Sequence, residues 1–341
     1  MLTSRYNLLL LNRRANEFQG VRETMEQFSF NSALMHFNRT HGPSGFLWKY
    51  ILGYVIGIGL LLGVMGYVMY SIWSPAIENL HAYSTDPQTL SNAQTEQMLV
   101  QHALVLTASI PVFLFFQAIF EAAALRHYMR DEGFSLRIGA DELRVFSVYL
   151  LWGLFGLIGT IAFMIISTIV SGVILGSAFL MRDSFIAPFA FLPVLLSYLI
   201  FIGLFFYFGI RLAPASAITV RDRRIAFFDG FAATKNRFWK MLGAYLVLMV
   251  IFYAINFAFN LAIGAAMAGM MLTNAEIFET DDPEAFLSLI FSPAMIVMTV
   301  AVAVFYVALQ AFTHFAFLGI ASKAARTDPT WKGNTKTADL F

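Results

Sequence analysis

RLAPASAITVRDRRIAFFDGFAATKNRFWK, residues Arg211 to Lys240, is the one long charged stretch between two strongly apolar runs. It contains seven basic residues and two acids. Basic, aromatic-rich connectors of this kind are typical of segments at a membrane surface, where each base contributes about 1 kcal/mol near anionic lipid. We therefore expect an interfacial lipid contact along this bridge. Its side chains are Arg221, Arg223, Arg224, Lys235, Arg237 and Lys240.

The composition on either side of the bridge is that of an integral membrane protein. Hydrophobic residues make up 59% of the chain, charged residues only 13%, and the mean hydropathy is +0.69. Soluble domains have about twice that charged fraction. The chain has no cysteine, which excludes disulfide and thiolate chemistry, and its six histidines show no metal-binding spacing. We expect neither a cofactor nor a metal site.

Six apolar runs predict an all-α, polytopic protein with six transmembrane helices, because a spanning helix needs roughly 20 residues. The third run has about 36 uncharged residues, so it predicts either a long tilted helix or a span with an interfacial extension. We expect residues 1–45 to form a cytoplasmic amphipathic N-terminal segment without a secretory signal, and residues 322–341 to form a cytoplasmic tail. The predicted spans are residues 46–73, 99–125, 146–181, 185–210, 241–272 and 286–321.

The distribution of charge predicts the orientation. Twenty of the 22 Lys and Arg residues fall in the N-terminal segment, the segment 126–144, the bridge and the C-terminal end, while Lys49 sits at the mouth of the first span. Only Arg182 falls on the other side, where the three connecting segments carry nine acids. By the positive-inside rule, both termini and the bridge are expected in the cytoplasm.

Three segments resemble one another and predict an internal triplication. FSFNSALMHFNRTHGPSGFLWKYILGYVI from Phe28 and IAFFDGFAATKNRFWKMLGAYLV from Ile225 both run from an aromatic surface segment to Trp-Lys, Leu-Gly and Tyr. FSLRIGADELRVFSVYLLWGLFG from Phe134 is a weaker copy. Each unit is a surface helix followed by a two-span hairpin, so the units would be parallel repeats. Alternatively, any basic interfacial helix before a span produces this pattern.

The repeat alignment gives Glu121, Arg211 and His314 equivalent places at the ends of spans two, four and six. Ionisable side chains at membrane depth are costly unless paired, so they are candidates for function. Gln117 and Gln310 lie one turn away on the same helix faces. This candidate polar site would bind an anionic headgroup or relay a proton, since histidine titrates near neutrality. The alternative is a buried structural network that fixes helix register.

Other polar and aromatic residues have structural explanations. Asn256 and Asn260, four residues apart in span five, predict hydrogen bonds between helices. Residues 135–144 predict a short surface helix on which Asp141 and Glu142 form a solvated face. Gly53, Gly57, Gly59 and Gly63 predict close helix packing in the first span. An aromatic belt accounts for the residues near span ends: Trp48, Tyr50, Tyr54, Trp73, Trp152 and Trp239.

Two segments carry a resemblance to a known group of proteins. They are Arg211-Leu-Ala-Pro-Ala-Ser-Ala-Ile at the end of a span and Gly230-Phe-Ala-Ala-Thr-Lys-Asn-Arg-Phe-Trp-Lys-Met-Leu-Gly after it. The chain resembles bacterial six-span inner-membrane proteins, which include the membrane domain of some glycerophosphodiester phosphodiesterases and stand-alone relatives of unknown activity. The resemblance implies a bacterial inner-membrane location. We expect no phosphodiesterase catalytic domain in these residues, so the resemblance does not imply that activity.

These observations favour a non-enzymatic inner-membrane protein that organises lipid, with anionic lipids or a membrane protein as its partner. The chain contains no Walker A motif, no GxSxG motif, no kinase motif set and no zinc signature. Nucleic acid is not an expected partner, because the bridge bases anchor the topology. The alternative is a transporter or channel subunit with its polar site between spans two, four and six, and an intramembrane enzyme is a third hypothesis.

Overall fold

The computed structural model describes residues 28–38, 42–78, 92–180, 191–274, 288–329 and 331, and within these ranges the protein is all-α, without strands. The six long helices are α3 (Phe46–Glu78), α5 (Asn92–Arg130), α6 (Ala140–Leu180), α7 (Phe191–Leu212), α10 (Phe238–Thr273) and α13 (Pro293–Arg326). The short helices are α2 (Phe30–Leu34), the 3-10 helix η1 (His36–Asn38), α8 (Ala215–Asp222) and α9 (Gly230–Ala233).

All six long helices are apolar and long enough to cross a membrane, which confirms the prediction of six long apolar helices and makes each a candidate span. Several of them exceed the predicted ranges because they continue as helix beyond the apolar run. The third, α6, is one unbroken helix of 41 residues, or about 60 Å, against a hydrocarbon thickness of about 30 Å. It is therefore a long helix and not a span with a separate interfacial extension.

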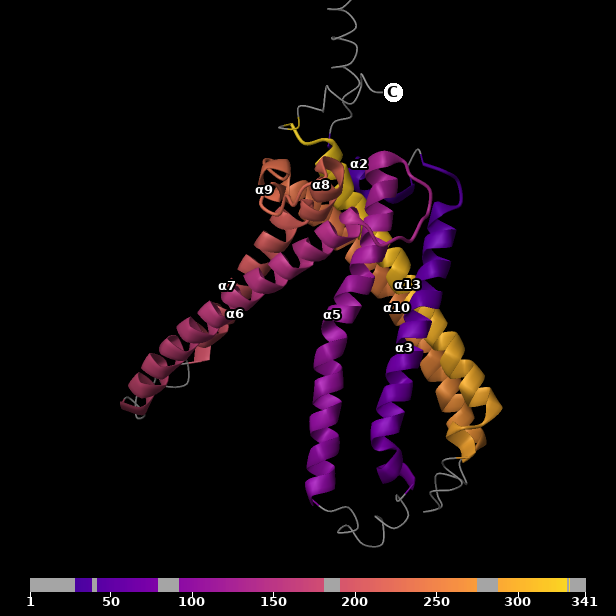
Figure 1. Ribbon diagram of the computed structural model, residues 1–341. Helices are drawn as coiled ribbons and strands as arrows, with labels where there is room; N and C mark the ends of the chain where they lie inside the picture. The colour runs from indigo at the N-terminus through magenta and orange to yellow at the C-terminus, as the bar shows by residue number, and fades with distance from the viewer. Residues whose placement is uncertain are drawn as a thin grey trace, which may run out of the picture.

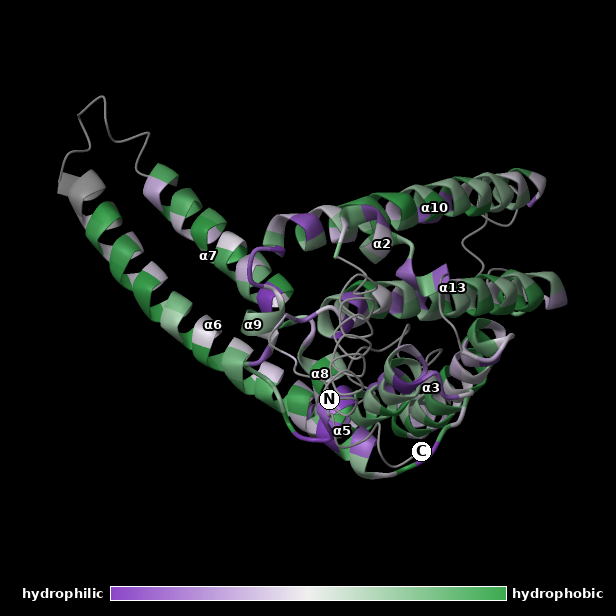
Figure 2. Ribbon diagram, turned by 90° about the horizontal axis from the view of Figure 1, so that it is seen from above, coloured by the Kyte–Doolittle hydropathy of each residue, from purple (hydrophilic) through white to green (hydrophobic). Residues whose placement is uncertain are grey.

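The six long helices converge at one end of the molecule, which we call the cap. The cap comprises α2, η1, the segment 131–139, α8 and α9, together with the adjoining ends of the long helices (Figure 1). From it, α6 and α7 run side by side away from the remaining helices, while α10 and α13 form a second pair. Seen from above, these two pairs and the α3–α5 pair diverge in different directions (Figure 2).

Buried side chains are concentrated at the cap, and most side chains of the spans are exposed. In the most apolar window of each span, between 0% and 11% of the residues are buried. The main core cluster lies where the helices meet, and many of its members are alanines, which permit close approach of helices. Its alanines are Ala118, Ala122, Ala124, Ala217, Ala226, Ala233, Ala311 and Ala325.

The first-span glycines only partly fulfil the packing prediction. A Cβ at Gly53 would meet the Phe134 ring at 2.9 Å, and one at Gly57 would meet the Phe116 ring at 2.7 Å. Positions 59 and 63 have open space around them. Close packing is therefore present at Gly53 and Gly57 and absent at Gly59 and Gly63.

The predicted surface helix over residues 135–144 is wrong, since residues 131–138 have no regular structure and α6 begins at Ala140. Short helices do precede α3 and α10, as α2 and α9. The bridge is also not one helix, because Arg223 (φ 55°) ends α8 in a left-handed conformation. Predictions for residues 1–27, for the connections 79–91, 181–190 and 275–287 and for the tail 332–341 lie outside the described residues.

The start of α9 packs directly on the end of α7. A Cβ at Gly230 would lie 2.9 Å from the Arg211 carbonyl oxygen and 3.1 Å from the Leu212 Cα atom. Both are backbone atoms, so a change of side-chain rotamer cannot relieve the contact. We expect Gly230→Ala to lower the free energy of unfolding by about 1–3 kcal/mol through overpacking, measured by denaturant titration in detergent.

Gly209→Ala is the matched control, because a Cβ at Gly209 in α7 meets nothing within 4 Å. This substitution should be neutral or slightly stabilising, since alanine costs less backbone entropy than glycine in a helix. Equal destabilisation by both variants would contradict the close approach.

Candidate functional site

Glu121 of α5 and His314 of α13 meet beneath the cap. The His314 Nε2 atom lies 3.4 Å from Glu121 Oε2, and the Glu121 side chain is 6% exposed while that of His314 is 25% exposed. The carboxylate is thus removed from solvent while its partner remains partly accessible. The structure brings together two members of the triad that the repeat alignment proposed.

Three further side chains complete the surroundings of this pair. The Tyr50 hydroxyl of α3 lies 3.1 Å from His314 Nδ1, and the Tyr149 hydroxyl of α6 donates to Glu121 Oε2. The Ser216 side chain of α8 lies against the same carboxylate. This arrangement fits the tautomer in which Tyr50 donates to Nδ1 and Nε2–H points at the carboxylate. A phenol, an imidazole and a carboxylate therefore form one hydrogen-bonded row.

Arg211, the third member of the proposed triad, points elsewhere. Its guanidinium donates to the Thr234 hydroxyl at 3.3 Å and to the Phe231 carbonyl at 3.5 Å, both in the bridge. Among the described residues it forms neither a hydrogen bond nor an ion pair with Glu121 or His314. The pair is instead surrounded by α3, α6 and α8, so the fourth span contributes no member to it.

The two glutamines one turn away have separate surroundings. Gln117 donates to the Tyr54 hydroxyl at 2.6 Å, within the core. Gln310 is exposed and lines a groove of about 520 Å³ between α10 and α13, together with Asn256, Thr313 and His314. His314 therefore faces the buried carboxylate on one side and this open groove on the other.

The predicted hydrogen bond between helices is confirmed for one asparagine of α10. Asn260 accepts from the Tyr306 hydroxyl of α13 at 2.8 Å. Asn256 instead donates to the carbonyl of Phe252 in its own helix at 2.9 Å.

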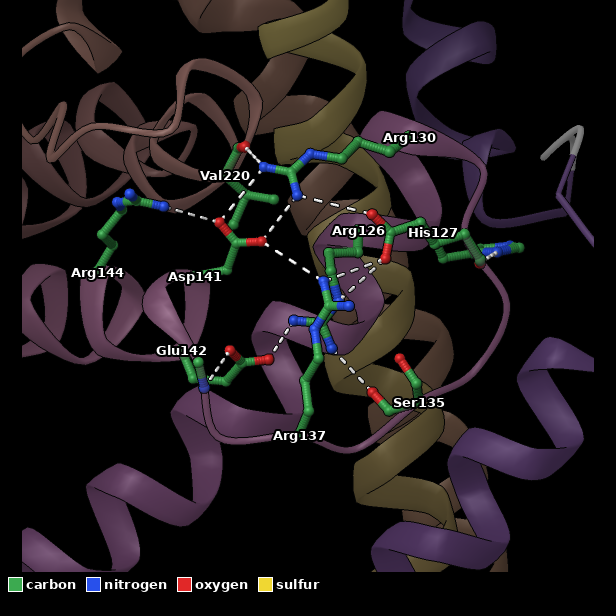
Figure 3. A network of polar contacts seen from close by, with 11 residues as sticks. Arg126, His127, Arg130, Ser135, Arg137, Asp141, Glu142, Arg144 and Val220 are labelled. Atoms are coloured by element: carbon green, nitrogen blue, oxygen red, sulfur yellow. Dashed lines mark hydrogen bonds and ion pairs between the residues drawn. The ribbon is translucent and has the colours of Figure 1, made fainter.

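A network of polar contacts lies at the junction of α5 and α6 (Figure 3). Arg126, in the last turns of α5, forms an ion pair with Glu142 in the first turn of α6, and their side chains are 1% and 0% exposed. Arg126 also donates to the Ser135 carbonyl at 2.8 Å. The second Glu142 oxygen accepts from the Gly139 backbone N–H at 3.0 Å. Both buried charges are thus neutralised and hydrogen-bonded.

A second ion pair runs parallel to the first. Arg130 donates to Asp141 at 2.7 Å, and it also donates to the Val220 carbonyl at the end of α8. Arg144 contacts the same carboxylate at 3.1 Å. The prediction of a solvated face for Asp141 and Glu142 is therefore wrong. The two arginines are four residues apart on α5, and this spacing presents both to the start of α6.

The six bridge cations fall into two groups. Arg221 donates to the Ala325 carbonyl of α13 and lies 3.7 Å from Asp328, Arg237 donates to the Thr327 hydroxyl at 2.9 Å, and Arg224 pairs with Asp229. Burial lowers the pKa of the Arg237 guanidinium, against the opposing charge of Asp328. The exposed cations without an ion pair among the described residues are Arg223, Lys235 and Lys240.

The tyrosines of the site were missed by the sequence interpretation. Tyr50 and Tyr54 were expected in an aromatic belt, but they are 0% and 1% exposed. Their spacing contains the signal, because Phe46, Tyr50, Tyr54 and Ile58 recur every four residues and form one buried face of α3. Trp48 and Trp239, at 70% and 77% exposed, do have the exposure expected of belt residues.

No group of three or more metal-ligating side chains occurs within the described ranges. No family model, no curated protein and no solved structure matches the chain.

The buried ion pair of the cap gives a direct test of this network. We expect Glu142→Gln to lower the free energy of unfolding by about 3–5 kcal/mol, because it removes the buried counter-charge of Arg126 and leaves only the partly exposed Glu132 carboxylate, 3.5 Å from the guanidinium. The measurement is a denaturant titration of the purified chain in detergent.

Asp229→Asn serves as the matched control. It removes the partner of Arg224 from an ion pair whose side chains are 59% and 40% exposed, and exposed pairs contribute about 0–1 kcal/mol. If the two variants lose the same stability, the network at the α5–α6 junction does not hold the cap.

Proposed function

We propose that the protein is a non-enzymatic membrane protein that organises phospholipid around and between its diverging hairpins, with a preference for anionic lipid. The observation that carries the proposal is the exposure of the spans. In the most apolar window of each span, at most 11% of the residues are buried within the protein. A helix that packs on few neighbours must be solvated by lipid chains or by another membrane protein.

The position of the charged and aromatic side chains supports a preference for anionic headgroups. Trp48 and Trp239 are exposed next to Lys49 and Lys240, at the cap ends of α3 and α10. Indole rings favour the headgroup level of a bilayer. Neighbouring ammonium groups attract anionic lipid. With Lys235, these residues form what we call the basic aromatic rim: Trp48, Lys49, Lys235, Trp239 and Lys240.

The proposal assigns the cap to the cytoplasmic side of a bacterial inner membrane, with both termini on that side. The support is the count of 20 of 22 Lys and Arg residues in the sequence segments expected on the cytoplasmic side. Of these segments, the structure describes residues 126–144 and the bridge in full, and both lie at the cap. A relation to the membrane domain of glycerophosphodiester phosphodiesterases is proposed on the segments 211–218 and 230–243 alone. A membrane protein partner between the hairpins is the alternative to lipid.

A charge-reducing variant tests the role of the rim. We expect Lys235→Gln combined with Lys240→Gln to lose about 2 kcal/mol of preference for anionic lipid, at about 1 kcal/mol for each base. The measurement is native mass spectrometry of the lipids retained from nanodiscs that mix phosphatidylglycerol and phosphatidylcholine.

The control is the double variant Lys235→Arg and Lys240→Arg, which keeps both charges and should retain the preference. Equal retention of the two lipids by the unmodified chain would contradict the proposal. Retention of a co-purifying membrane protein in place of lipid would favour the partner.

A second candidate function is proton transport, and the observation that favours it is the position of His314. This side chain contacts the buried Glu121 carboxylate and also lines the groove between α10 and α13. A titratable group between a buried carboxylate and an accessible groove is suited to passing a proton.

Proteoliposomes with an entrapped pH-sensitive dye test this candidate. Proton flux above that of empty liposomes, abolished by Glu121→Gln and retained by Glu132→Gln in the cap, would support transport. Flux that is the same in the unmodified chain, in Glu121→Gln and in empty liposomes rules it out.

A further inference from the structure

A polar cavity of about 510 Å³ opens on the cap between the end of α5, the start of α6 and the end of α8. It shares no lining residue with the Glu121–His314 pair or with the basic aromatic rim, and several of its lining residues form the ion pairs drawn in Figure 3. Its walls are unusually rich in charge. The lining residues are Arg130, Glu132, Arg137, Ala140, Asp141, Glu142, Arg144 and Arg223.

The cavity floor is already satisfied by contacts within the protein. Arg130 donates to both oxygens of Asp141 and to the Val220 carbonyl. Glu142 is occupied by Arg126 and by the Gly139 backbone N–H. Because these groups are already paired with one another, we do not expect them to bind a ligand directly.

Three other arginines of the cavity lining still have N–H donors that form no contact within the protein. Arg144 donates through Nη1 to Asp141, and Arg137 reaches Glu132 at 3.3 Å with a side chain that is 51% exposed. Arg223, exposed at the end of α8, makes no hydrogen bond or ion pair among the described residues. Each guanidinium carries five N–H donors, so most of the donors of these three arginines remain available to a ligand.

The charge balance of the cavity favours an anion. Five arginines, Arg126 included, face three carboxylates, so the cavity has an excess of two positive charges. Ala140, in the wall, is the first residue of α6, and the N-terminus of a helix adds partial positive charge and free N–H groups.

We propose that this cavity, which we call the arginine pocket, binds a phosphate group. Arg137, Arg144 and Arg223 come from the 131–139 segment, α6 and α8, and so approach a shared ligand from three directions. A tetrahedral phosphate presents several oxygens to such donors, and guanidinium groups bind them in bidentate fashion. The phosphate belongs either to a lipid headgroup or to a soluble phosphorylated molecule. The proposal does not rest on the lipid-organising role of the rim.

The carboxylates of the cavity fix the positions of its arginines. Asp141 holds Arg130 and Arg144 in place, so that the ligand does not have to order them when it binds. Preorganised side chains lower the entropic cost of binding. The pocket is therefore a built site in which acids position the bases.

Two binding measurements on the full chain distinguish the sources of phosphate. In the first, inorganic phosphate is titrated into the detergent-purified chain by calorimetry. In the second, the chain is placed in phosphatidylcholine nanodiscs with and without phosphatidic acid, and retained lipid is measured by native mass spectrometry. Binding in both arms indicates a pocket open to soluble ligands, and selective retention of phosphatidic acid alone indicates a lipid headgroup. Either result supports the proposal.

Variants of the exposed arginines test the location. We expect Arg223→Gln and Arg137→Gln each to weaken binding by about tenfold, the usual effect of losing a hydrogen bond to a charged group. Neither residue is buried, so both variants should fold. Arg224→Gln is the control, since it removes the same charge one residue away but its partner Asp229 lies outside the pocket.

Two results would overturn the proposal. One is the absence of binding in both arms. The other is an equal loss in Arg223→Gln, Arg137→Gln and the Arg224→Gln control, which would show diffuse attraction in place of a pocket. Because Lys235 and Lys240 are untouched in these variants, failure here leaves the preference for anionic lipid at the rim to be judged by its own test.

Discussion

The ion pair between Arg126 and Glu142 is the interaction on which the arrangement of the helices depends. Both side chains are inaccessible to solvent, and a charge in that position is tolerated only beside its counter-charge. The pair fixes the first turn of α6 on the last turns of α5. Arg130 extends the junction to the end of α8 through the Val220 carbonyl. Polar contacts of the cap, and not packing within the membrane, therefore set the directions in which the hairpins leave it.

The importance of the cap contacts is consistent with where charge lies in the described residues, most of whose charged side chains are in or next to the cap. The spans carry apolar side chains on almost every face and bury little of them, so in a membrane these faces require lipid chains or another membrane protein to cover them. Charged groups gather in the cap, where Arg221 and Arg237 tie the bridge to the end of α13. The bridge cations outside these ties include Arg223, Lys235 and Lys240, which are exposed. The same layer thus contains the connection between the helices, the basic aromatic rim and the arginine pocket.

The sequence was informative where the signal is local. Six spans follow from run length and hydropathy, which need no knowledge of neighbours. The contact between Glu121 and His314 was anticipated from the repeat alignment. The alignment could not show that Arg211 lies apart from this pair, because an equivalent position in a helix does not fix the direction of a long side chain. Asp141 and Glu142 were misjudged for the opposite reason, since charged residues at a helix start look solvated until Arg126 and Arg130 are known to face them. Tyr50 and Tyr54 needed the four-residue period of α3 to be given more weight than their nearness to a span end.

The central claim is that the cap holds the hairpins apart while lipid fills the space between them. The absence of native cysteine allows spin labels to be attached through single cysteines at exposed sites, Ile165 on α6 and Leu261 on α10. Double electron–electron resonance in lipid nanodiscs then reports the separation of the two hairpins. A single long distance, close to that between these positions in the structure, is the result expected. A short distance, as in a closed six-helix bundle, would contradict the account.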